Sequence, residues 1–341
     1  RFSTGTFNLL PCAFGEVTWD DPKPYVIYGF LFVDNCTWNI AAGTEIYVHG
    51  DLVNADGTIY QDGRITVLSN GTVNAAGTLE DPIVIQGDRL EENFADVAGQ
   101  WSGFVIDDLS SGNTFEHTII KNSTIGVFVD SAAELSLRNS QIYNTSSYGI
   151  RGRHSRINME NCLLYNNFSS SSAFIDFGGD YEFTYCTFAN YGVDANALSI
   201  SNFFCYVFGD LGNCELGDAY RLNARFTNCI FAGSKRDQIS SFDITDGQNP
   251  AMFNYRFDNC LVRYDELEEN IPRFEQSFQN LTRINSSLDT LFVSTSEDDY
   301  RLDSLSLAEG KAVPIPTISS DIEGNMRDAQ TPDVGCYEHQ D

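Results

Sequence analysis

The sequence predicts an all-β protein, a right-handed parallel β-helix (solenoid) with a C-terminal capping segment. The first observation is a short pattern, with a large apolar residue first, a small residue fourth and most often asparagine last, that recurs along the chain. The second is that helical periodicity is missing, whereas alternating apolar and polar residues, punctuated by Gly, Asn, Asp and Ser, recur throughout.

The copies of the pattern align without gaps. They read FEHTIIKN, LRNSQIYN, MENCLLYN, FTYCTFAN, FTNCIFAG and FDNCLVRY, and they begin at Phe115, Leu137, Met159, Phe183, Phe226 and Phe257. The first copies follow one another at about 22 residues, which suits one coil of a β-solenoid and is too short for most two-helix repeats. The longer step from Phe183 to Phe226 predicts either one extra coil or a long loop, which residues 202–218 could supply.

Successive coils of such a solenoid lie about 4.8 Å apart, so equivalent positions stack. The first position of each copy should form one inward ladder, and the sixth should form another: Ile120, Ile142, Leu164, Phe188, Phe231 and Val262. The last position predicts an asparagine ladder at a bend, with side-chain amides bonding to one another and to turn backbone. Its members are Asn122, Asn144, Asn166 and Asn190.

The cysteines fit the same arrangement. Cys162, Cys186, Cys229 and Cys260 occupy the small inward position, where a thiol behaves as a compact hydrophobe. Metal binding is the sharper alternative, but the CxxC spacing of zinc sites is missing. We expect disulfides between Cys12 and Cys36 and between Cys205 and Cys214, which implies an oxidising compartment. Cys336 is left over.

The chain should be one domain. Residues 1–30, interrupted by Pro11, Pro22 and Pro24, are expected to form an N-terminal lead-in or cap, and residues 31–298 the β-helix. Residues 299–341 are expected to be the C-terminal cap, because a solenoid exposes an apolar open end that must be covered. Residues 265–285 could be a short helix or a lateral arm.

Composition excludes several classes of protein. Among the 341 residues, 48 are Asp or Glu and 20 are Lys or Arg, which gives a net charge of -28. Such a surface repels phosphate backbones and anionic lipids, so nucleic-acid binding is excluded. No stretch reaches the roughly 18 to 20 apolar residues of a membrane-spanning helix.

Several segments resemble the right-handed parallel β-helix surface lipoproteins of Bacteroidota. They are KPYVIYGFLFVD (23–34), DPIVIQGDRLEE (81–92), GQWSGFVI (99–106) and IIKNSTIGVFVD (119–130). The endings DYRLDS and DIEGNMR, followed by PDVGCYE, resemble a closing motif of many bacterial β-helix proteins. Members usually carry a lipobox cysteine and a small sandwich-like domain before the β-helix, and this sequence begins after both.

The resemblance implies a fold and a location more than an activity. It implies a protein on the outer membrane, facing outward, whose anchor is missing from this chain. It also implies O-glycosylation at an Asp-Ser or Asp-Thr motif, for which Ser131, Thr290 and Ser304 qualify.

The sequence offers few catalytic candidates. A galacturonase-type site needs paired carboxylates with a nearby His, and Asp107-Asp108 lacks the Gly-His that would follow. For a lyase of uronate polymers, Lys121 could be the base and Arg138 the group that neutralises the substrate carboxylate, with calcium as a further aid. Glu116 and Glu160 flank Arg138, so an alternating charge ladder explains the same residues without catalysis.

Two clusters suggest binding instead. Tyr143 and Tyr165 stack one coil apart in an outward column, which is typical of a carbohydrate platform or an interface, unless an arm such as residues 265–285 covers them. The dense basic patch consists of Arg151, Arg153, His154 and Arg156. It could contact an anionic glycan or an acidic partner, or it could be a bend solvated beside acidic neighbours.

We therefore expect a non-enzymatic cell-surface β-helix protein that serves as a rigid binding or structural module. It would be tethered to the outer membrane, could be a subunit of an envelope assembly, and would have surface proteins or a polysaccharide as partners. The alternative is a polysaccharide lyase or hydrolase acting on an anionic glycan in the lateral groove. No metal site and no cofactor is expected, apart from calcium in the lyase alternative.

Overall fold

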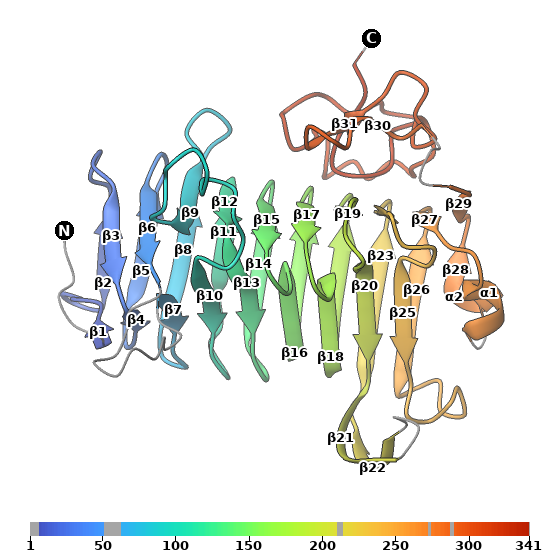
Figure 1. The fold of residues 1–341 in the computed structure, drawn as a ribbon, viewed down its shortest axis with the longest axis horizontal. Helices are drawn as coiled ribbons and strands as arrows, with labels where there is room; N and C mark the ends of the chain where they lie inside the picture. The colour runs from blue at the N-terminus through green and yellow to red at the C-terminus, as the bar shows by residue number, and fades with distance from the viewer. Residues whose placement is uncertain (1–6, 51–62, 210–213, 272–273, 287–289, 341) are drawn as a thin grey trace.

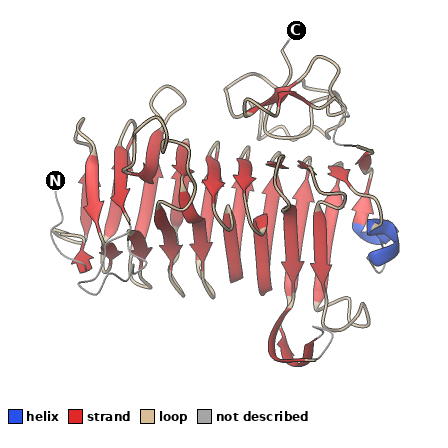
Figure 2. Cartoon of the chain, in the orientation of Figure 1, coloured by secondary structure: helices blue, strands red, loops and turns tan. Residues whose placement is uncertain are grey.

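A computed structural model of the chain describes residues 7–50, 63–209, 214–271, 274–286 and 290–340. These residues form a row of stacked coils built almost entirely from strands (Figures 1 and 2). Strands of successive coils pair in parallel, and they form a 17-stranded and a 10-stranded sheet that share one core. The protein is therefore an all-β parallel β-helix, which confirms the predicted fold class.

Each regular coil contributes one strand to each of three faces. The first face contains β1 (Phe7–Leu9), β4 (Phe30–Val33), β7 (Arg64–Val67), β10 (Trp101–Ile106), β13 (Ser123–Val129), the first parts of β16 (Ile150–Glu160) and β18 (Ser171–Thr184), β20 (Asn196–Ser201) and β25 (Ile239–Phe242). The second face contains β2 (Glu16–Trp19), β5 (Thr37–Ala41), β8 (Thr72–Ala76), β11 (Asn113–Glu116), β14 (Glu134–Arg138), the second parts of β16 and β18, β23 (Leu222–Thr227), β26 (Phe253–Asp258) and β28 (Phe278–Gln279).

The third face is the 10-stranded sheet. It contains β3 (Tyr25–Tyr28), β6 (Glu45–His49), β9 (Ile83–Gly87), β12 (Thr118–Lys121), β15 (Gln141–Thr145), β17 (Leu163–Asn167), β19 (Thr187–Asn190), β24 (Ile230–Gly233), β27 (Leu261–Arg263) and β29 (Thr282–Ile284). The 17-stranded sheet joins the first two faces because β16 and β18 run continuously around the bend between them.

The strand register confirms both predicted apolar ladders. Phe115 pairs with Leu137, and the same column continues through Phe226, Phe257 and Phe278. The rings of Phe257 and Phe278 stack at 4.5 Å. The free thiols Cys162, Cys186, Cys229 and Cys260 are buried in the same core. Burial raises the pKa of the first three, so these thiols stay protonated and inert.

In the coils from β11 onward, the bend between the second and third faces is made by a single left-handed residue. Its members are His117, Asn139, Asn161, Tyr185, Asn228, Asn259 and Asn280, all with positive φ. Asparagine tolerates this conformation better than most residues, which explains its frequency there. The Nδ2 of Asn161 donates to the Oδ1 of Asn139 at 3.1 Å, so amides do bond from coil to coil at this bend.

The predicted asparagine ladder lies at the next bend. Asn122, Asn144 and Asn190 are buried, which confirms a stack of buried asparagines there. Bonds from amide to amide and from amide to backbone were both expected, and Asn122 and Asn190 make the second kind. The amide of Asn122 donates to the carbonyl of Ala95, and that of Asn190 donates to the carbonyl of Asn196, the first residue of β20.

The 43-residue separation of register partners Asp180 and Asn223 contains a hairpin rather than an extra coil. β18 pairs directly with β23, so no coil lies between them. The insertion holds β21 (Phe203–Phe208) and β22 (Cys214–Ala219), which pair antiparallel and project from the solenoid (Figure 1). Cys205 and Cys214 form a disulfide across it, and Cys12 and Cys36 form the other, so both predicted pairs are confirmed.

The N-terminal residues already form a coil. Phe7 pairs with Phe30 and Glu16 with Thr37, so residues 7–28 build the first turn of the β-helix instead of a lead-in. Pro11, Pro22 and Pro24 fit because they lie between strands, where a missing N–H removes no ladder hydrogen bond.

Residues 265–285 close the C-terminal end of the solenoid. They contain the short helices α1 (Leu267–Asn270) and α2 (Phe274–Ser277), which lie at the end of the row in Figure 1. Leu267 and Ile271 are buried in the main core, and Phe274 stacks on Phe278 at 4.4 Å. This segment is therefore the end cap and not a lateral arm. No helix among the described residues is long and apolar enough to cross a membrane.

The C-terminal tail, from Leu291 onward, folds back along the third face (Figure 1). It contains an antiparallel hairpin, β30 (Phe292–Ser294) and β31 (Asp299–Leu302). The backbone N–H of Gly335 donates to the carbonyl of Asn228, and that of Cys336 donates to the hydroxyl of Thr187. The expectation that residues 299–341 cap the open end is thus corrected: the tail packs on the outward-facing Leu163, Ile230 and Leu261 of the third face, and α1 and α2 already lie at the end.

Candidate binding cleft

The basic patch of the sequence lies on β16, at the bend between the first and second faces. His154 forms the bend with φ 49°, so Arg151 and Arg153 precede it on the first face and Arg156 follows it on the second. The four residues therefore occupy separate environments and do not form one continuous cationic surface.

Arg151 is a packed and neutralised cation. Its guanidinium lies 5.4 Å from the ring centres of Phe128 and Phe174 and 5.6 Å from that of Tyr148. Its Nη2 donates to the carboxylate of Asp176 at 2.5 Å. Asp176 is buried, and that burial raises its pKa despite the opposing effect of Arg151. This arrangement anchors the first face and leaves Arg151 little freedom to engage a ligand.

Arg153 and Arg156 are also paired. Arg153 binds both carboxylate oxygens of Asp130, and this hydrogen bonding raises the pKa of the guanidinium. Arg156 donates to Glu134 at 2.9 Å. The patch is charge-balanced, as in the alternative of a bend beside acidic neighbours, so any ligand would meet oriented hydrogen-bond donors and not a net positive field.

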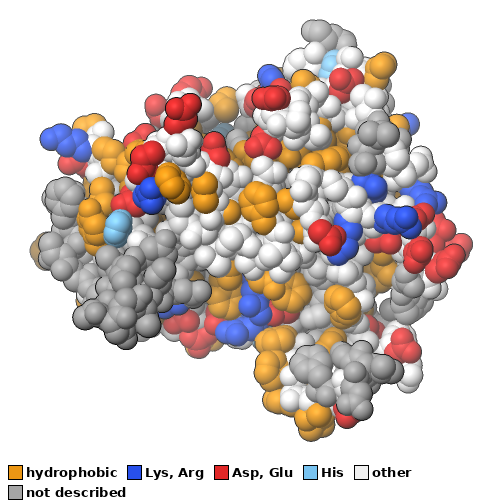
Figure 3. Space-filling model, in the orientation of Figure 1, with side chains coloured by type: hydrophobic (Ala, Val, Ile, Leu, Met, Phe, Trp, Pro, Cys, Tyr) orange, Lys and Arg blue, Asp and Glu red, His pale blue; other side chains and the backbone are white. Residues whose placement is uncertain are grey.

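The projecting hairpin turns this bend into a cleft. The hairpin cleft has a volume of about 330 Å³ and is lined by Ser131, Arg153, His154, Phe177, Phe204, Tyr206 and Tyr220. Phe177 meets Phe204 edge-on at 4.9 Å, and Phe204 meets Tyr206 in the same way at 4.9 Å. The side chain of Tyr206 is 55% exposed, and Figure 3 shows hydrophobic side chains on the tip that carries β21 and β22.

His154 lines this cleft, and one contact of its ring defines the tautomer. Its Nδ1 lies 3.1 Å from the carbonyl of Phe177, and because a carbonyl can only accept, Nδ1 must carry the hydrogen. In the neutral ring, Nε2 then keeps its lone pair. The ring also packs against Tyr220 at 5.2 Å, which fixes its orientation.

A second depression adjoins the hairpin cleft and shares His154 with it. The bend depression, of about 290 Å³, is lined by Ala132, Glu134, His154, Ser155, Arg156, Gly179, Asp180 and Arg221. The two depressions therefore continue one another around the bend between the first and second faces.

The predicted tyrosine platform is covered by the chain itself. Tyr143 and Tyr165 stack at 4.5 Å as expected, but Tyr165 is only 7% exposed because Tyr300 of the tail packs 4.9 Å from it. The covering segment is the tail and not residues 265–285. Burial raises the pKa of Tyr143 to about 12, with the Asp96 carboxylate as a further cause.

The lyase candidates do not converge. Lys121 lies on the third face, where its Nζ pairs with Asp96 at 3.7 Å, whereas Arg138 lies on the second face and pairs with Glu160 at 3.2 Å. Arg138 stands in register between Glu116 and Glu160, so the charge ladder describes its surroundings. Lys121, the expected base, therefore lies on a different face from this arginine.

The predicted glycosylation acceptors have different settings. Ser131 is half-buried and lines the hairpin cleft, whereas Thr290 and Ser304 are exposed near and within the tail. Among the described residues, no group of three or more His, Cys, Asp or Glu side chains is placed to hold a metal ion.

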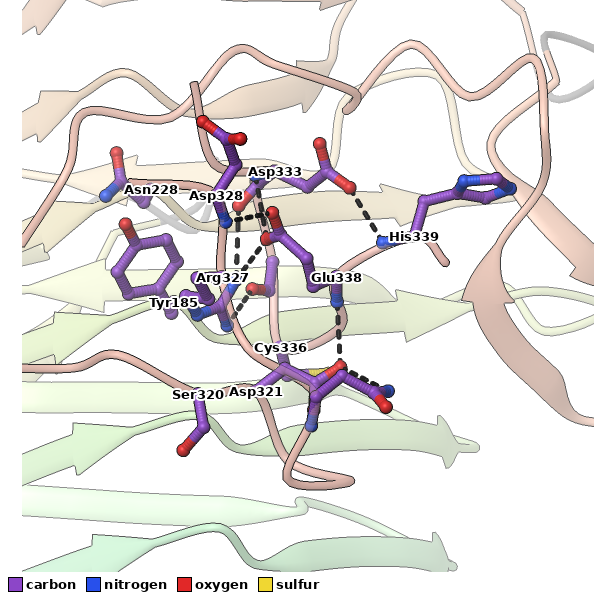
Figure 4. Close-up of polar contacts among 12 residues, drawn as sticks. Tyr185, Asn228, Ser320, Asp321, Arg327, Asp328, Asp333, Cys336, Glu338 and His339 are labelled. Atoms are coloured by element: carbon purple, nitrogen blue, oxygen red, sulfur yellow. Dashed lines mark hydrogen bonds and ion pairs between the residues drawn. The ribbon is translucent and has the colours of Figure 1, made fainter. Parts of the chain in front are cut away.

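The closing motif of the sequence proves to be a structural clasp (Figure 4). The guanidinium of Arg327 lies 3.8 Å from the ring centre of Tyr185, and it donates to Asn161 at 2.9 Å and to Glu338 at 3.3 Å. Asp321 accepts the backbone N–H of Glu338 at 2.9 Å. These charged residues hold the tail on the third face and do not form an open site.

Sequence reasoning missed the aromatic residues of the cleft, Phe177, Phe204, Tyr206 and Tyr220. The available signal was the run FFCYVF, which interrupts the repeat inside a disulfide-bridged insertion. An aromatic-rich segment that belongs to no ladder has no place in the core, so its side chains must cover another surface or remain exposed.

The comparisons with known proteins assign the chain to no family. No protein-family model matches the chain, and no curated protein matches it either. Among solved structures, it is similar to pectate lyase Pel9A, with a TM-score of 0.30 and 13% sequence identity, over 92% of this chain and 88% of that one. The chain itself is a parallel β-helix.

Proposed function

We propose that this protein is a non-enzymatic β-helix module that works outside the cytoplasm and binds a glycan in the hairpin cleft. The observation that carries the proposal is the cleft itself. Half-exposed aromatic rings from a disulfide-bridged hairpin face the polar groups of His154 and Arg153 across a cavity of about 330 Å³. Concave sites with apolar walls and a few oriented polar groups are the usual form of a ligand site.

The chemistry of the lining suits a sugar. A pyranose ring has an apolar C–H face, which Tyr206 or Tyr220 could cover, and a rim of hydroxyl groups that both donate and accept. The lone pair of His154 Nε2 would accept from a hydroxyl, and the guanidinium of Arg153 would donate to one. Because Asp130 already holds Arg153 in place, little side-chain entropy is lost when it binds.

Two further observations support a binding module in an oxidising compartment. The two disulfides favour a location outside the cytoplasm. The Lys121 and Arg138 pair, on which the lyase alternative depended, lies on two different faces. The β-helix then serves as the rigid support that keeps the cleft open.

The test is binding of a glycan panel to Tyr206→Ala and Tyr220→Ala. Each change removes one stacking surface and should weaken glycan binding about tenfold, measured by isothermal titration calorimetry. Phe168→Ala is the matched control, because Phe168 is exposed but does not line the cleft. Failure of the unaltered protein to bind any glycan would overturn the proposal, as would release of shortened chains from a polysaccharide during incubation.

A further inference from the structure

Two arginines lie directly opposite each other on the second face. Arg225 of β23 and Arg256 of β26 are register partners on neighbouring strands, which are about 4.8 Å apart. Like charges in this position repel each other and destabilise a sheet. The repulsion would be relieved by an anion bound between them.

The hydrogen-bonding capacity of both side chains is largely unused. Arg256 donates to Asp258 through its Nε, at 2.7 Å from each carboxylate oxygen, so this ion pair is made by the Nε and not by the terminal nitrogens. Arg225 is exposed and stands in register between Arg256 on one side and Glu182 of β18 on the other. Two guanidinium groups therefore lie side by side on this face.

These arginines line a depression of about 370 Å³, the arginine pocket. Its walls are Tyr181, Glu182, Asn223, Ala224, Arg225, Asn254 and Arg256. Asn254 donates to Asn223 at 2.7 Å, and Asn223 donates towards Asp180 at 3.4 Å, so the amides form an ordered row beside the arginines. The pocket thus combines cationic donors, neutral amides and one carboxylate.

The arginine pocket continues the path that begins at the hairpin cleft. Asp180 lines the bend depression and Glu182, two residues further along β18, lines the arginine pocket. Arg221 and Asn223 stand in the same relation at the start of β23. The hairpin cleft, bend depression and arginine pocket therefore follow one another along neighbouring strands.

We propose that the arginine pocket binds the carboxylate of an acidic sugar, so that the glycan held in the hairpin cleft is a uronic-acid polymer. This inference rests on the proposed function and names the class of glycan. Arg225 and Arg256 would share the carboxylate, and Glu182 would accept hydrogen bonds from hydroxyl groups of the same sugar. Inorganic sulfate could take the place of the carboxylate between the two arginines, but it has no hydroxyl group from which Glu182 could accept a hydrogen bond.

The experiment compares oligogalacturonate with its carboxyl-reduced, neutral counterpart. The double variant Arg225→Gln/Arg256→Gln should bind oligogalacturonate at least tenfold more weakly, because it loses charge-assisted hydrogen bonds. Binding of the neutral oligosaccharide should be unchanged. Arg138→Gln is the control, since Arg138 is on the same face, is paired with Glu160 and does not line the pocket.

The outcomes separate this inference from the proposal on which it rests. Equal binding of the acidic and neutral sugars, with no effect of the double variant, would overturn the uronate assignment. If Tyr206→Ala still weakened both, the glycan-binding proposal would stand. If the unaltered protein bound neither sugar nor any other glycan, both would fall.

Discussion

The third face and the hairpin cleft both carry apolar side chains on the outside of the solenoid, and the chain treats them differently. On the third face, Leu163, Ile230 and Leu261 are buried under the tail, so that column completes a second core. At the cleft, Tyr206 remains 55% exposed beside oriented polar groups. An outward apolar column therefore marks a binding surface only where no other part of the chain covers it.

The largest loss of stability is expected from a substitution of Arg327, whose clasp holds the tail over the third face. Arg327→Met would leave the carboxylate of Glu338 buried without its cation, which costs about 3–5 kcal/mol. We expect a lower unfolding midpoint in chemical denaturation and faster proteolytic loss of the tail. Ligand binding in the hairpin cleft should be retained, because the tail does not line it.

Arg301→Gln is the matched control for the clasp. Arg301 lies in the same tail, but its side chain is 57% exposed and pairs with Asp299, two residues before it. Exposed ion pairs contribute little to stability. If Arg301→Gln and Arg327→Met shifted the denaturation midpoint equally, the clasp would not be what holds the tail in place.

Raising the pH above 10 should destabilise the protein through Tyr143 on the third face, by less than the loss of the Arg327 clasp. Burial raises the pKa of Tyr143 to about 12, whereas an unfolded tyrosine ionises near its ordinary pKa of 10.0. The unfolded state therefore loses its proton first, so this contribution to stability is complete below pH 10 and is lost as the pH rises towards 12. Denaturation midpoints measured across this range should fall, and Tyr143→Phe should fall less steeply.

The ladders could be predicted because each coil repeats the same pattern of residue types. A large apolar residue, a small residue and a second apolar residue recur at fixed positions, so the repeat alone is enough to pair Phe226 with Phe257. The disulfide across the hairpin could be predicted because Cys205 and Cys214 bracket a short loop, with a sequence separation of 9.

The end cap and the tail could not be told apart from the sequence. Both segments carry apolar residues without a repeat, and nothing local says whether Leu267 or Leu302 meets an end or a face of the solenoid. Their places depend on which surface remains uncovered once the coils have stacked. The cleft was missed for the same reason, because the hairpin brings Tyr206 to His154 only through contacts between separate coils.

Hydrogen–deuterium exchange with and without a uronic-acid oligosaccharide tests the central claim most directly. We predict that the ligand protects backbone amides of β21, β22 and the bend at His154, and leaves the tail over the third face unchanged. Protection confined to the tail and the third face, with none at the hairpin, would contradict the account.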